Sequence, residues 1–536
     1  MLFRFSINKE AIMKKLIPIF ILLITTCLYS TIINVPADQP TIQAGIVAAA
    51  DTDTVLVADG TYFENIDFIS KPITVASNFL IDADPLHIEN TIINGSQATN
   101  PDLGSCVRFT SNEDTTSVII GFTLTEGTGT LDPGWGTIAG GIWMSGSSPT
   151  ICNNIITENS ADYTGGVSCA YSSNPRIIDN VISYNTSTTL NCGGLEFYQN
   201  SNAYVEGNII SNNFAQGHTG GVSIELSYPT FINNIIENNS SNITTGGVLI
   251  LNSSPTFVCN IIRGNSALGD NVGGLAIQDS DANIINCLIS GNNCDGVGGG
   301  ILVSNSQSEI INCTIVGNLS YDQGGGICNS ISSNSSLVNC ILWDNLPEQI
   351  YIFSGSVTVI YSDIQDGWTG TGNIDEDPLF VGTGDHPFML QDLSPCVNTG
   401  DPNTTGLNLP ELDLAGNSRI YGGRIDMGAY ENQNVVGVDD LVIPSFTQLH
   451  QNYPNPFNPT TTISYQLPEE SEVELTIYNL KGQKVKQLVN DQLPDGQHSI
   501  VWNGKDDNGK SVSSSIYFYK LKTDNHEETK KMILMK

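Results

Sequence analysis

Eight Gly-Gly pairs recur along the chain at a nearly constant spacing. They begin at residues 140, 165, 193, 220, 246, 273, 299 and 325, so that consecutive pairs lie 25 to 28 residues apart. Each pair opens an alternating run such as GGVSIE or GGVLIL, and each unit later carries an apolar segment that ends in Asn, such as NNIIENN. A unit this short cannot bury an apolar side by itself, whereas stacked copies can, so the repeat constrains the fold more than any other feature.

The pattern within each unit predicts short β-strands joined by tight turns. Apolar residues recur at every second position or form short β-branched runs, which is typical of strands. Gly, Asn, Ser and Pro fill the segments between these runs and favour turns. We therefore interpret each unit as one coil of two or three strands, and the stacked coils as a solenoid whose strands form parallel sheets.

Stacking predicts columns of equivalent residues, because successive coils lie about 4.8 Å apart. The position two residues after the first Gly is apolar in every unit and should point inward: Ile142, Val167, Leu195, Val222, Val248, Leu275, Ile301 and Ile327. Two polar columns are built from the Asn that ends each apolar segment and from the Asn five residues before it, which is replaced in the last three units by Cys287, Cys313 and Cys340. We expect the Asn amides to hydrogen-bond from coil to coil, since buried polar groups need partners, and the Cys residues to pack as small apolar side chains.

This arrangement resembles the right-handed parallel β-helix of the pectate-lyase-like superfamily. The likeness extends over residues 31–431, from the opening TIINVPADQPTIQAG to NIDEDPLF, SPCVNTGDP and RIDMGAYE near the end. It implies a capping helix near residues 40–50, regular coils over 140–345 and closing coils over 346–431. The superfamily contains lyases, hydrolases, epimerases, adhesins and inert scaffolds, so the resemblance is specific for the fold and not for an activity.

A different module follows the repeat. Residues 432–447 are interpreted as a linker, and alternating runs such as VELTIYNL and IYFYKL within residues 448–536 predict about seven strands in a small Ig-like β-sandwich. This module resembles the type A C-terminal sorting domain of the type IX secretion system, through NYPNPFNPTT, YNLKGQKV, HSIVWNGKDDNGK and IYFYKL. It departs from that family in having Ser515 where a Gly usually precedes the IYFY-like strand. The resemblance implies recognition of residues 448–536 by a secretion translocon; an Ig-like appendage without a sorting role is the alternative.

The beginning of the chain predicts export. Residues 1–30 carry Lys14 and Lys15 before an apolar run, followed by small or polar residues near Ser30, as in a secretory signal peptide. Cys27 raises a lipoprotein alternative, although Thr26 is a poor fit before it. No other segment is long and apolar enough to predict a transmembrane anchor, so we expect a secreted protein or one on the outer-membrane cell surface.

The acidic composition of the repeat region limits the kinds of partner that the protein can bind. Residues 31–440 contain only six Lys and Arg against 43 Asp and Glu. Such a surface disfavours nucleic acid, whose contacts need basic side chains. No cofactor is predicted; calcium could bridge the surface to an anionic glycan, although no dense ligand motif is present and no metal-binding residue is assigned. The eleven cysteines beyond the signal follow the coil period and are interpreted mostly as buried residues, with a leftover thiol or a disulfide framework as the alternative.

The regular coils lack the catalytic motifs of the β-helix enzymes, which use an Arg base with Asp-bound calcium or clustered Asp residues with a nearby His. The best local candidates for catalysis are Glu196 and Glu225, whose Cα atoms we place roughly 8 Å apart on neighbouring coils, with His218 close by. Two carboxylates at such a separation can act as acid and base in glycoside cleavage. Solvated surface carboxylates are the alternative.

The same strands carry unusually apolar residues at positions that should face outward. Trp143, Tyr198, Leu249 and Leu251 form the predicted ligand-binding face, which could stack on sugar rings or contact another protein. A loop that covers this sheet would explain the same residues. The first functional hypothesis is a noncatalytic scaffold that binds glycan or another surface; the second is a polysaccharide lyase or glycoside hydrolase. Short loops between coils favour the first.

Overall fold

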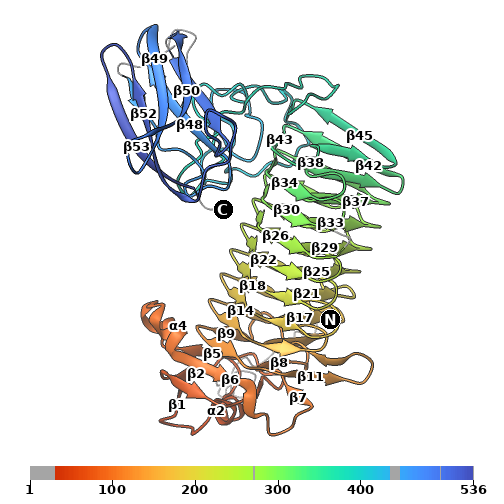
Figure 1. Cartoon of the computed structure of the whole chain (residues 1–536). Coiled ribbons are helices and arrows are strands. Elements are labelled where there is room, and N and C mark those ends of the chain that lie inside the picture. Colours follow the sequence, from red (N-terminus) through yellow and green to blue (C-terminus); the bar gives the residue numbers. More distant parts are fainter. Residues whose placement is uncertain (1–29, 270–271, 435–446, 495, 535–536) are drawn as a thin grey trace, which may run out of the picture. The chain divides into compact units, whose positions relative to one another are not determined.

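A computed structural model describes residues 30–269, 272–434, 447–494 and 496–534. It confirms the predicted fold class, because the chain is all-β and combines a right-handed parallel β-solenoid with a C-terminal Ig-like domain (Figure 1). The predicted signal peptide, except for Ser30, and most of the predicted linker lie outside the described residues. The chain divides into two compact units, Met1–Pro229 and Thr230–Lys536, which are described in turn.

Three parallel sheets and one sheet of two-residue strands run through the first unit. Sheet A, formed after the turn that follows each sheet C strand, holds β1 (Ile32–Val35), β2 (Thr54–Val57), β5 (Thr74–Ser77), β9 (Val118–Ile120), β14 (Thr150–Cys152), β18 (Arg176–Ile178) and β22 (Tyr204–Glu206). Sheet B holds β3 (Gly60–Tyr62), β6 (Thr91–Asn94), β10 (Thr123–Thr125), β15 (Ile155–Thr157), β19 (Val181–Ser183) and β23 (Ile209–Ser211). Sheet C, which follows the Gly-Gly pairs, holds β4 (Ile66–Asp67), β8 (Val107–Phe109), β13 (Ile142–Ser145), β17 (Val167–Ala170), β21 (Leu195–Tyr198) and β25 (Val222–Glu225). The short sheet holds β16 (Ser160–Ala161), β20 (Thr186–Ser187) and β24 (Phe214–Ala215).

The second unit repeats this plan from Thr230 onward. Sheet A holds β26 (Thr230–Ile232), β30 (Thr256–Val258), β34 (Asn283–Ile285), β38 (Gln307–Ile311), β42 (Ser333–Val338) and β45 (Gly355–Ile360). Sheet B holds β27 (Ile235–Glu237), β31 (Ile261–Arg263), β35 (Leu288–Ser290), β39 (Thr314–Val316), β43 (Ile341–Trp343) and β46 (Asp363–Ile364). Sheet C holds β29 (Val248–Leu251), β33 (Leu275–Gln278), β37 (Ile301–Ser304), β41 (Ile327–Ser330) and β44 (Ile350–Ile352). The short sheet holds β28 (Ser240–Ser241), β32 (Ser266–Ala267), β36 (Asn293–Cys294) and β40 (Leu319–Ser320).

The Gly-Gly pairs are required because neighbouring coils touch at these positions. A Cβ atom on Gly166 would lie 2.3 Å from the carbonyl oxygen of Gly194, and a Cβ atom on Gly194 would lie 2.5 Å from that of Gly221. Backbone oxygens cannot move aside, so only Gly fits. Each Gly-Gly pair therefore packs directly against the pair of the next coil and sets the spacing of sheet C.

The predicted Asn columns are hydrogen-bonded ladders. In the first unit, the side-chain amide of Asn154 donates to Oδ1 of Asn180 (3.1 Å). The side-chain amide of Asn180 donates in the same way to Oδ1 of Asn208 (3.0 Å). Each acceptor oxygen also takes a backbone N–H, as Oδ1 of Asn180 does from Asn154 (3.0 Å). Asn159 and Asn185 start the second ladder in the same way. The ladders satisfy buried polar groups at the turns on both sides of sheet B.

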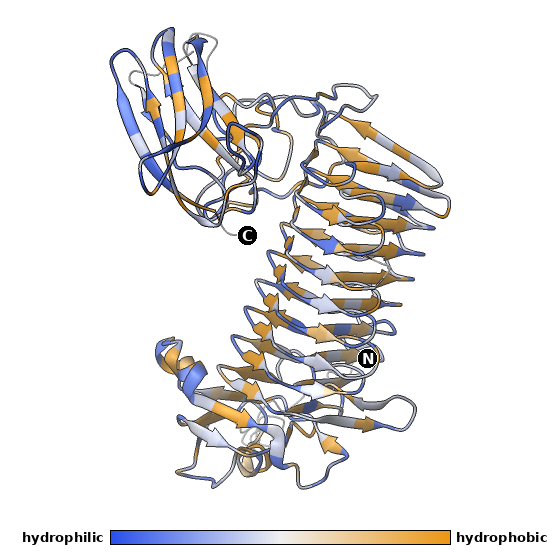
Figure 2. Cartoon of the chain, viewed as in Figure 1, coloured by the Kyte–Doolittle hydropathy of each residue, from blue (hydrophilic) through white to orange (hydrophobic). Residues whose placement is uncertain are grey.

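Apolar side chains fill the interior of the coils. Figure 2 shows hydrophobic residues along the strands of successive coils, and the predicted inward column from Ile142 to Ile327 is buried throughout. Cys287, Cys313 and Cys340 continue the first Asn column and are also fully buried. All eleven cysteines of the described residues are free, which agrees with their interpretation as packing residues.

Short helices and one hairpin interrupt the coils of the first unit. Helix α2 (Ile42–Ala48) lies in the segment expected to be helical, is capped by the side chain of Thr41, and buries Ile42 and Ile46. The remaining elements are α3 (Phe79–Asp82), α4 (Leu86–Asn90), the 3-10 turn η1 (Gly95–Gln97) and an antiparallel sheet of β7 (Leu103–Gly104), β11 (Gly129–Asp132) and β12 (Gly136–Ile138). The hairpin β11–β12 was not predicted.

The C-terminal module has seven strands in two antiparallel sheets. One sheet holds β47 (Gln448–Leu449), β48 (Thr461–Leu467) and β51 (Gly496–Trp502); the other holds β50 (Lys484–Leu493), β49 (Ser471–Asn479), β52 (Ser515–Lys522) and β53 (Glu527–Leu534). Their alternating residues bury a core that includes Trp502, Tyr465 and Tyr519. The predicted Ig-like sandwich is thus present, with a core made of its own residues.

Candidate functional site

The two predicted catalytic carboxylates lie on neighbouring strands of sheet C, but they do not face each other. Glu196 on β21 pairs in register with Ser168 and Ser223, whereas Glu225 at the end of β25 pairs with Tyr198. Each residue therefore has a different neighbour and a different environment.

Glu196 is sealed inside the protein. The residue is only 2% exposed to solvent. The carboxylate oxygen Oε2 accepts hydrogen bonds from the hydroxyls of Thr164 and Ser168, each at 2.6 Å, and Oε1 accepts one from the Asn191 amide. Burial raises the pKa of Glu196, and the hydrogen bonds from Ser168, Thr164 and Asn191 oppose that rise. With both oxygens engaged by three donors, this carboxylate holds the loop at Asn191 against sheet C.

Glu225 remains at the surface. It is half-buried, and burial raises its pKa while His218 acts in the opposite direction. His218 is exposed, and its backbone N–H donates to the carbonyl of Leu190 (2.6 Å). The structure therefore brings two of the three predicted catalytic residues together at the surface and places Glu196 beneath it.

Four aromatic side chains gather beside Glu225, and we call them the aromatic patch: Trp135, Tyr163, Tyr171 and Tyr198. The rings of Trp135 and Tyr163 lie 5.3 Å apart between centroids, and those of Tyr171 and Tyr198 meet edge to face at 6.1 Å. The Trp135 side chain also interacts with the Tyr171 phenol, which joins the two pairs. Trp135 is 45% exposed and Tyr171 is 38% exposed, so ring surface is open to solvent.

The hairpin β11–β12 presents Trp135 to the patch. Its position is set by Asp162, whose carboxylate oxygen Oδ2 accepts hydrogen bonds from the backbone N–H (3.1 Å) and hydroxyl (3.0 Å) of Thr137. The Thr137 backbone hydrogen bond is the main cause that lowers the pKa of Asp162. Only Tyr198 of the four aromatic residues was predicted as part of a site. The Asp-Pro-Gly-Trp-Gly turn at 132–136, an interruption between strand patterns, was the signal that could have indicated Trp135.

The predicted ligand-binding face is partly covered, which corrects the expectation for two of its four residues. Trp143 and Leu249 are each only 7% exposed. Trp143 packs with Ile138 and Ala139 of the hairpin segment, beneath Tyr163 and Tyr198. Leu249 packs in a second small cluster with Val272, Ala276, Leu302 and Cys328. The connections that precede the Gly-Gly pairs thus cover the outer side of sheet C, as the alternative interpretation held, and only Tyr198 and Leu251 remain half-exposed.

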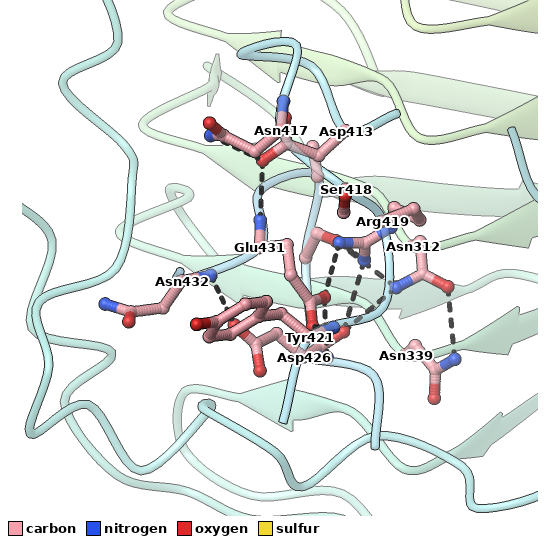
Figure 3. A network of polar contacts seen from close by, with 12 residues as sticks. Asn312, Asn339, Asp413, Asn417, Ser418, Arg419, Tyr421, Asp426, Glu431 and Asn432 are labelled. Atoms are coloured by element: carbon pink, nitrogen blue, oxygen red, sulfur yellow. Dashed lines mark hydrogen bonds and ion pairs between the residues drawn. The ribbon is translucent and has the colours of Figure 1, made fainter. Parts of the chain in front are cut away.

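A second polar cluster lies in the closing coils of the second unit (Figure 3). Arg419 pairs with Glu431 at 2.9 Å and donates to the backbone carbonyls of Asp426 and Gly428. Asp426 and Glu431 are fully buried, and burial is the main cause that raises their pKa values to about 6 and about 8. The side chain of Asn312 donates to the Asp426 carbonyl (3.0 Å) and so ties this segment to the coils. Because Arg419, Asp426 and Glu431 are buried at the centre of this cluster, they serve to fix the closing coils.

Neither cluster forms a metal site by its geometry. Among the residues that the structure describes, no group of three or more His, Cys, Asp or Glu side chains is arranged to hold a metal ion. Within the same residues, no helix is long and apolar enough to cross a membrane.

Comparison with known proteins supports the two parts of the fold. A family model described as right handed beta helix region matches residues 136–262, and a model described as FlgD Ig-like domain matches residues 454–527. No curated protein matches the chain. The C-terminal module is therefore Ig-like, while its resemblance to a sorting domain stays a prediction.

Three solved structures are partly similar to the chain, each at low sequence identity. The chain is similar to pectate lyase Pel9A, with 15% identity over 73% of this chain and 90% of that one and a TM-score of 0.39. It is also similar to the catalytic unit of a GH87 alpha-1,3-glucanase from Streptomyces thermodiastaticus strain HF3-3, with 16% identity over 63% and 66% and a TM-score of 0.38. A third match, to PorZ of Porphyromonas gingivalis, has 17% identity, a TM-score of 0.13, and covers 16% of this chain and 11% of PorZ. No functional argument rests on these likenesses.

Proposed function

We propose that the protein is an exported, noncatalytic β-solenoid that binds glycan through the aromatic patch. The observation that carries the proposal is the convergence of Trp135, Tyr163, Tyr171 and Tyr198 on one surface, with two of these residues more than a third exposed. Exposed aromatic rings rimmed by polar groups are typical of binding surfaces, because a ring offers a flat apolar face and a tyrosine adds a hydrogen-bonding hydroxyl. Sugar rings, with C–H faces and hydroxyl edges, match that combination.

Binding without cleavage is supported by the state of Glu196. Most glycoside cleavage needs a general acid and a second carboxylate, both of which must reach the substrate. Glu196 is 2% exposed and engaged by three hydrogen-bond donors. Asp162, next to Tyr163 in the chain, is engaged by Thr137. Glu225 with His218 therefore lacks the partner carboxylate that the predicted pair required, so the enzyme hypothesis is the weaker candidate.

Export and surface display complete the proposal. The signal-like residues 1–30 and the sorting-domain resemblance of residues 448–536 support transport across an outer membrane, with a type IX translocon as partner. In this role the solenoid presents its patch outside the cell, either released or held at the surface.

Affinity electrophoresis of the protein lacking residues 1–30, in gels containing neutral polysaccharides, tests glycan binding. We expect retardation by at least one polysaccharide, and Trp135→Ala and Tyr171→Ala should each weaken binding about tenfold, as loss of an interface aromatic residue commonly does. Tyr184→Ala is the matched control, because Tyr184 is 61% exposed in the same unit and lies outside the patch.

Reducing-end and unsaturated-product assays on the same polysaccharides separate binding from catalysis. The proposal predicts binding without products. Turnover that disappears in Glu225→Gln would replace the scaffold with an enzyme, and binding that Trp135→Ala and Tyr171→Ala leave unchanged would remove the patch from the proposal.

A further inference from the structure

We infer that the aromatic patch selects an uncharged or amine-bearing glycan and rejects acidic polysaccharides. This inference deepens the proposed function and rests on it. It follows from the charges that surround the patch and from the positions of the Lys and Arg side chains among residues 30–229.

Carboxylates border the patch on several sides. Glu225 is the direct cross-strand neighbour of Tyr198. Asp132 ends β11 just before the turn that carries Trp135, and its charge acts on the Tyr171 phenol. The charges of Glu196 and Glu225 both act on the Tyr163 phenol. A ligand stacked on these rings therefore lies close to the carboxylates of Glu225 and Asp132.

The basic residues that could offset this charge are committed elsewhere. Residues 30–229, all of which the structure describes, contain three Lys and Arg side chains. The ammonium of Lys71 donates to three carbonyls at the end of α2, including those of Ile46 and Ala49. Arg108 is 8% exposed and pairs with Asp67, and Arg176 stacks over the ring of Tyr204 at 5.0 Å.

A uronate or sulfate group at the patch would therefore lack a Lys or Arg partner among residues 30–229. Its charge would face like charges at close range, and repulsion of this kind is an effective way to exclude a ligand. Hydroxyl and ammonium groups, in contrast, can donate hydrogen bonds to the carboxylates of Glu225 and Asp132. His218, whose charge acts on Glu225, is a further titratable base near the patch.

Polysaccharides that share one backbone and differ only in charge provide the test. We would compare hydroxyethyl-cellulose with carboxymethyl-cellulose, and dextran with dextran sulfate and diethylaminoethyl-dextran, by affinity electrophoresis at 0.15 M salt (on the order of physiological ionic strength). Each is run with Trp135→Ala and Tyr171→Ala, so that only binding lost in these variants is attributed to the patch. We expect patch-dependent binding of a neutral or amine-bearing member to be at least tenfold tighter than that of its acidic counterpart.

Variants that remove one negative charge test whether the carboxylates beside the patch cause the discrimination. Glu225→Gln and Asp132→Asn should at least halve the discrimination against the acidic polymer, whereas Glu206→Gln, the same charge change on β22, should leave it unchanged. Equal or tighter patch-dependent binding of the acidic polymer overturns this inference and leaves glycan binding standing. No patch-dependent binding of any polymer overturns the proposed function and the inference together.

Discussion

At the scale of single residues, burial of the Asp363 carboxyl group makes the stability of the protein depend on pH. Asp363 on β46 is fully buried; its carboxylate accepts a hydrogen bond from the Cys396 thiol (3.1 Å) and one from the backbone N–H of Glu376 (3.2 Å). Burial is the main cause that raises the pKa of Asp363 to about 7. The folded protein therefore holds this proton at a pH at which the unfolded chain has released it.

This shift sets the direction of a pH effect on stability. The unfolded Asp ionises near pH 3.9, so the stability that the protonated carboxyl contributes is lost as pH rises from about 4 through about 7. We predict that Asp363→Asn, which cannot ionise, gains stability relative to the wild type as pH rises, by at most about 4 kcal/mol at pH 8. Urea unfolding of the full chain at pH 4, 6 and 8 measures this difference.

The matched control for that experiment is Asp366→Asn, because Asp366 is exposed three residues further on. Its stability relative to the wild type should not change with pH. A constant difference between Asp363→Asn and the wild type across the range would show that the Asp363 carboxyl does not carry the effect.

Sequence alone predicted the direction of side chains within a strand, but not the environment of Glu196. Alternation placed Val248 and Ile250 inside, and the structure buries both completely. Glu196 occupies an outward position by the same rule. It is buried because Thr164, Ser168 and Asn191 converge on it from other parts of neighbouring coils, and no periodic pattern marks that convergence.

At the scale of elements, the Asn ladders hold the turns on both sides of sheet B, and the ladder through Asn180 lies between sheets A and B. Asn180 accepts two hydrogen bonds from Asn154, one from its backbone N–H and one from its amide. The Asn154 amide also donates to the carbonyls of Ile119 and Cys152, whereas the Asn154 backbone N–H donates to Oδ1 of Asn180. Loss of the Asn180 side chain would leave that buried N–H without its ladder partner.

We predict that Asn180→Ala lowers the free energy of unfolding by about 2 to 4 kcal/mol, because a buried N–H loses its acceptor and several side-chain bonds are removed. Asn180→Cys should cost less, since the chain itself places Cys287 at the equivalent position, where Sγ accepts the backbone N–H of Asn260 at 3.4 Å. Chemical denaturation of both variants checks the order. Equal losses would mean that the hydrogen bond to the backbone does not matter.

A sequence repeat predicts the elements that recur in every coil, but not the elements that occur outside the repeat. The period predicted sheets, turns and ladders because every coil repeats the same contacts. The hairpin β11–β12 occurs once, so the repeat gave no information about it, and Trp135 was missed with it. The cover over sheet C was foreseen only as an alternative, because the connections that form it vary in sequence from coil to coil.

For the whole molecule, the two parts of the chain have separate tasks in our proposal. The Ig-like module has a core of its own residues and carries half of the chain's 20 basic residues. We predict that deleting residues 448–536 leaves the solenoid in the periplasm of a bacterium that has a type IX system, whereas the full chain reaches the cell surface or the medium. Cell fractionation with an antibody to the solenoid measures the distribution.

A fusion of residues 448–536 to a fluorescent protein carrying the same signal peptide is the reciprocal test and should be exported. Export of the truncated chain at the full-length level would contradict the sorting role. Circular dichroism of the truncated chain verifies that the solenoid still folds, so that misfolding cannot be mistaken for failed sorting.

The contacts between Gly-Gly pairs and between ladder residues also limit how such a chain can change in length. Asn180 accepts from one neighbouring coil and donates to the other, so the faces that a coil offers on its two sides are complementary. Removing or duplicating a complete coil would rejoin matching faces, whereas removing part of one would break a Gly-Gly contact and both ladders. Steps of 25 to 28 residues show that the connections absorb small differences. One whole coil is therefore the natural increment by which descendants of this gene can lengthen or shorten the protein.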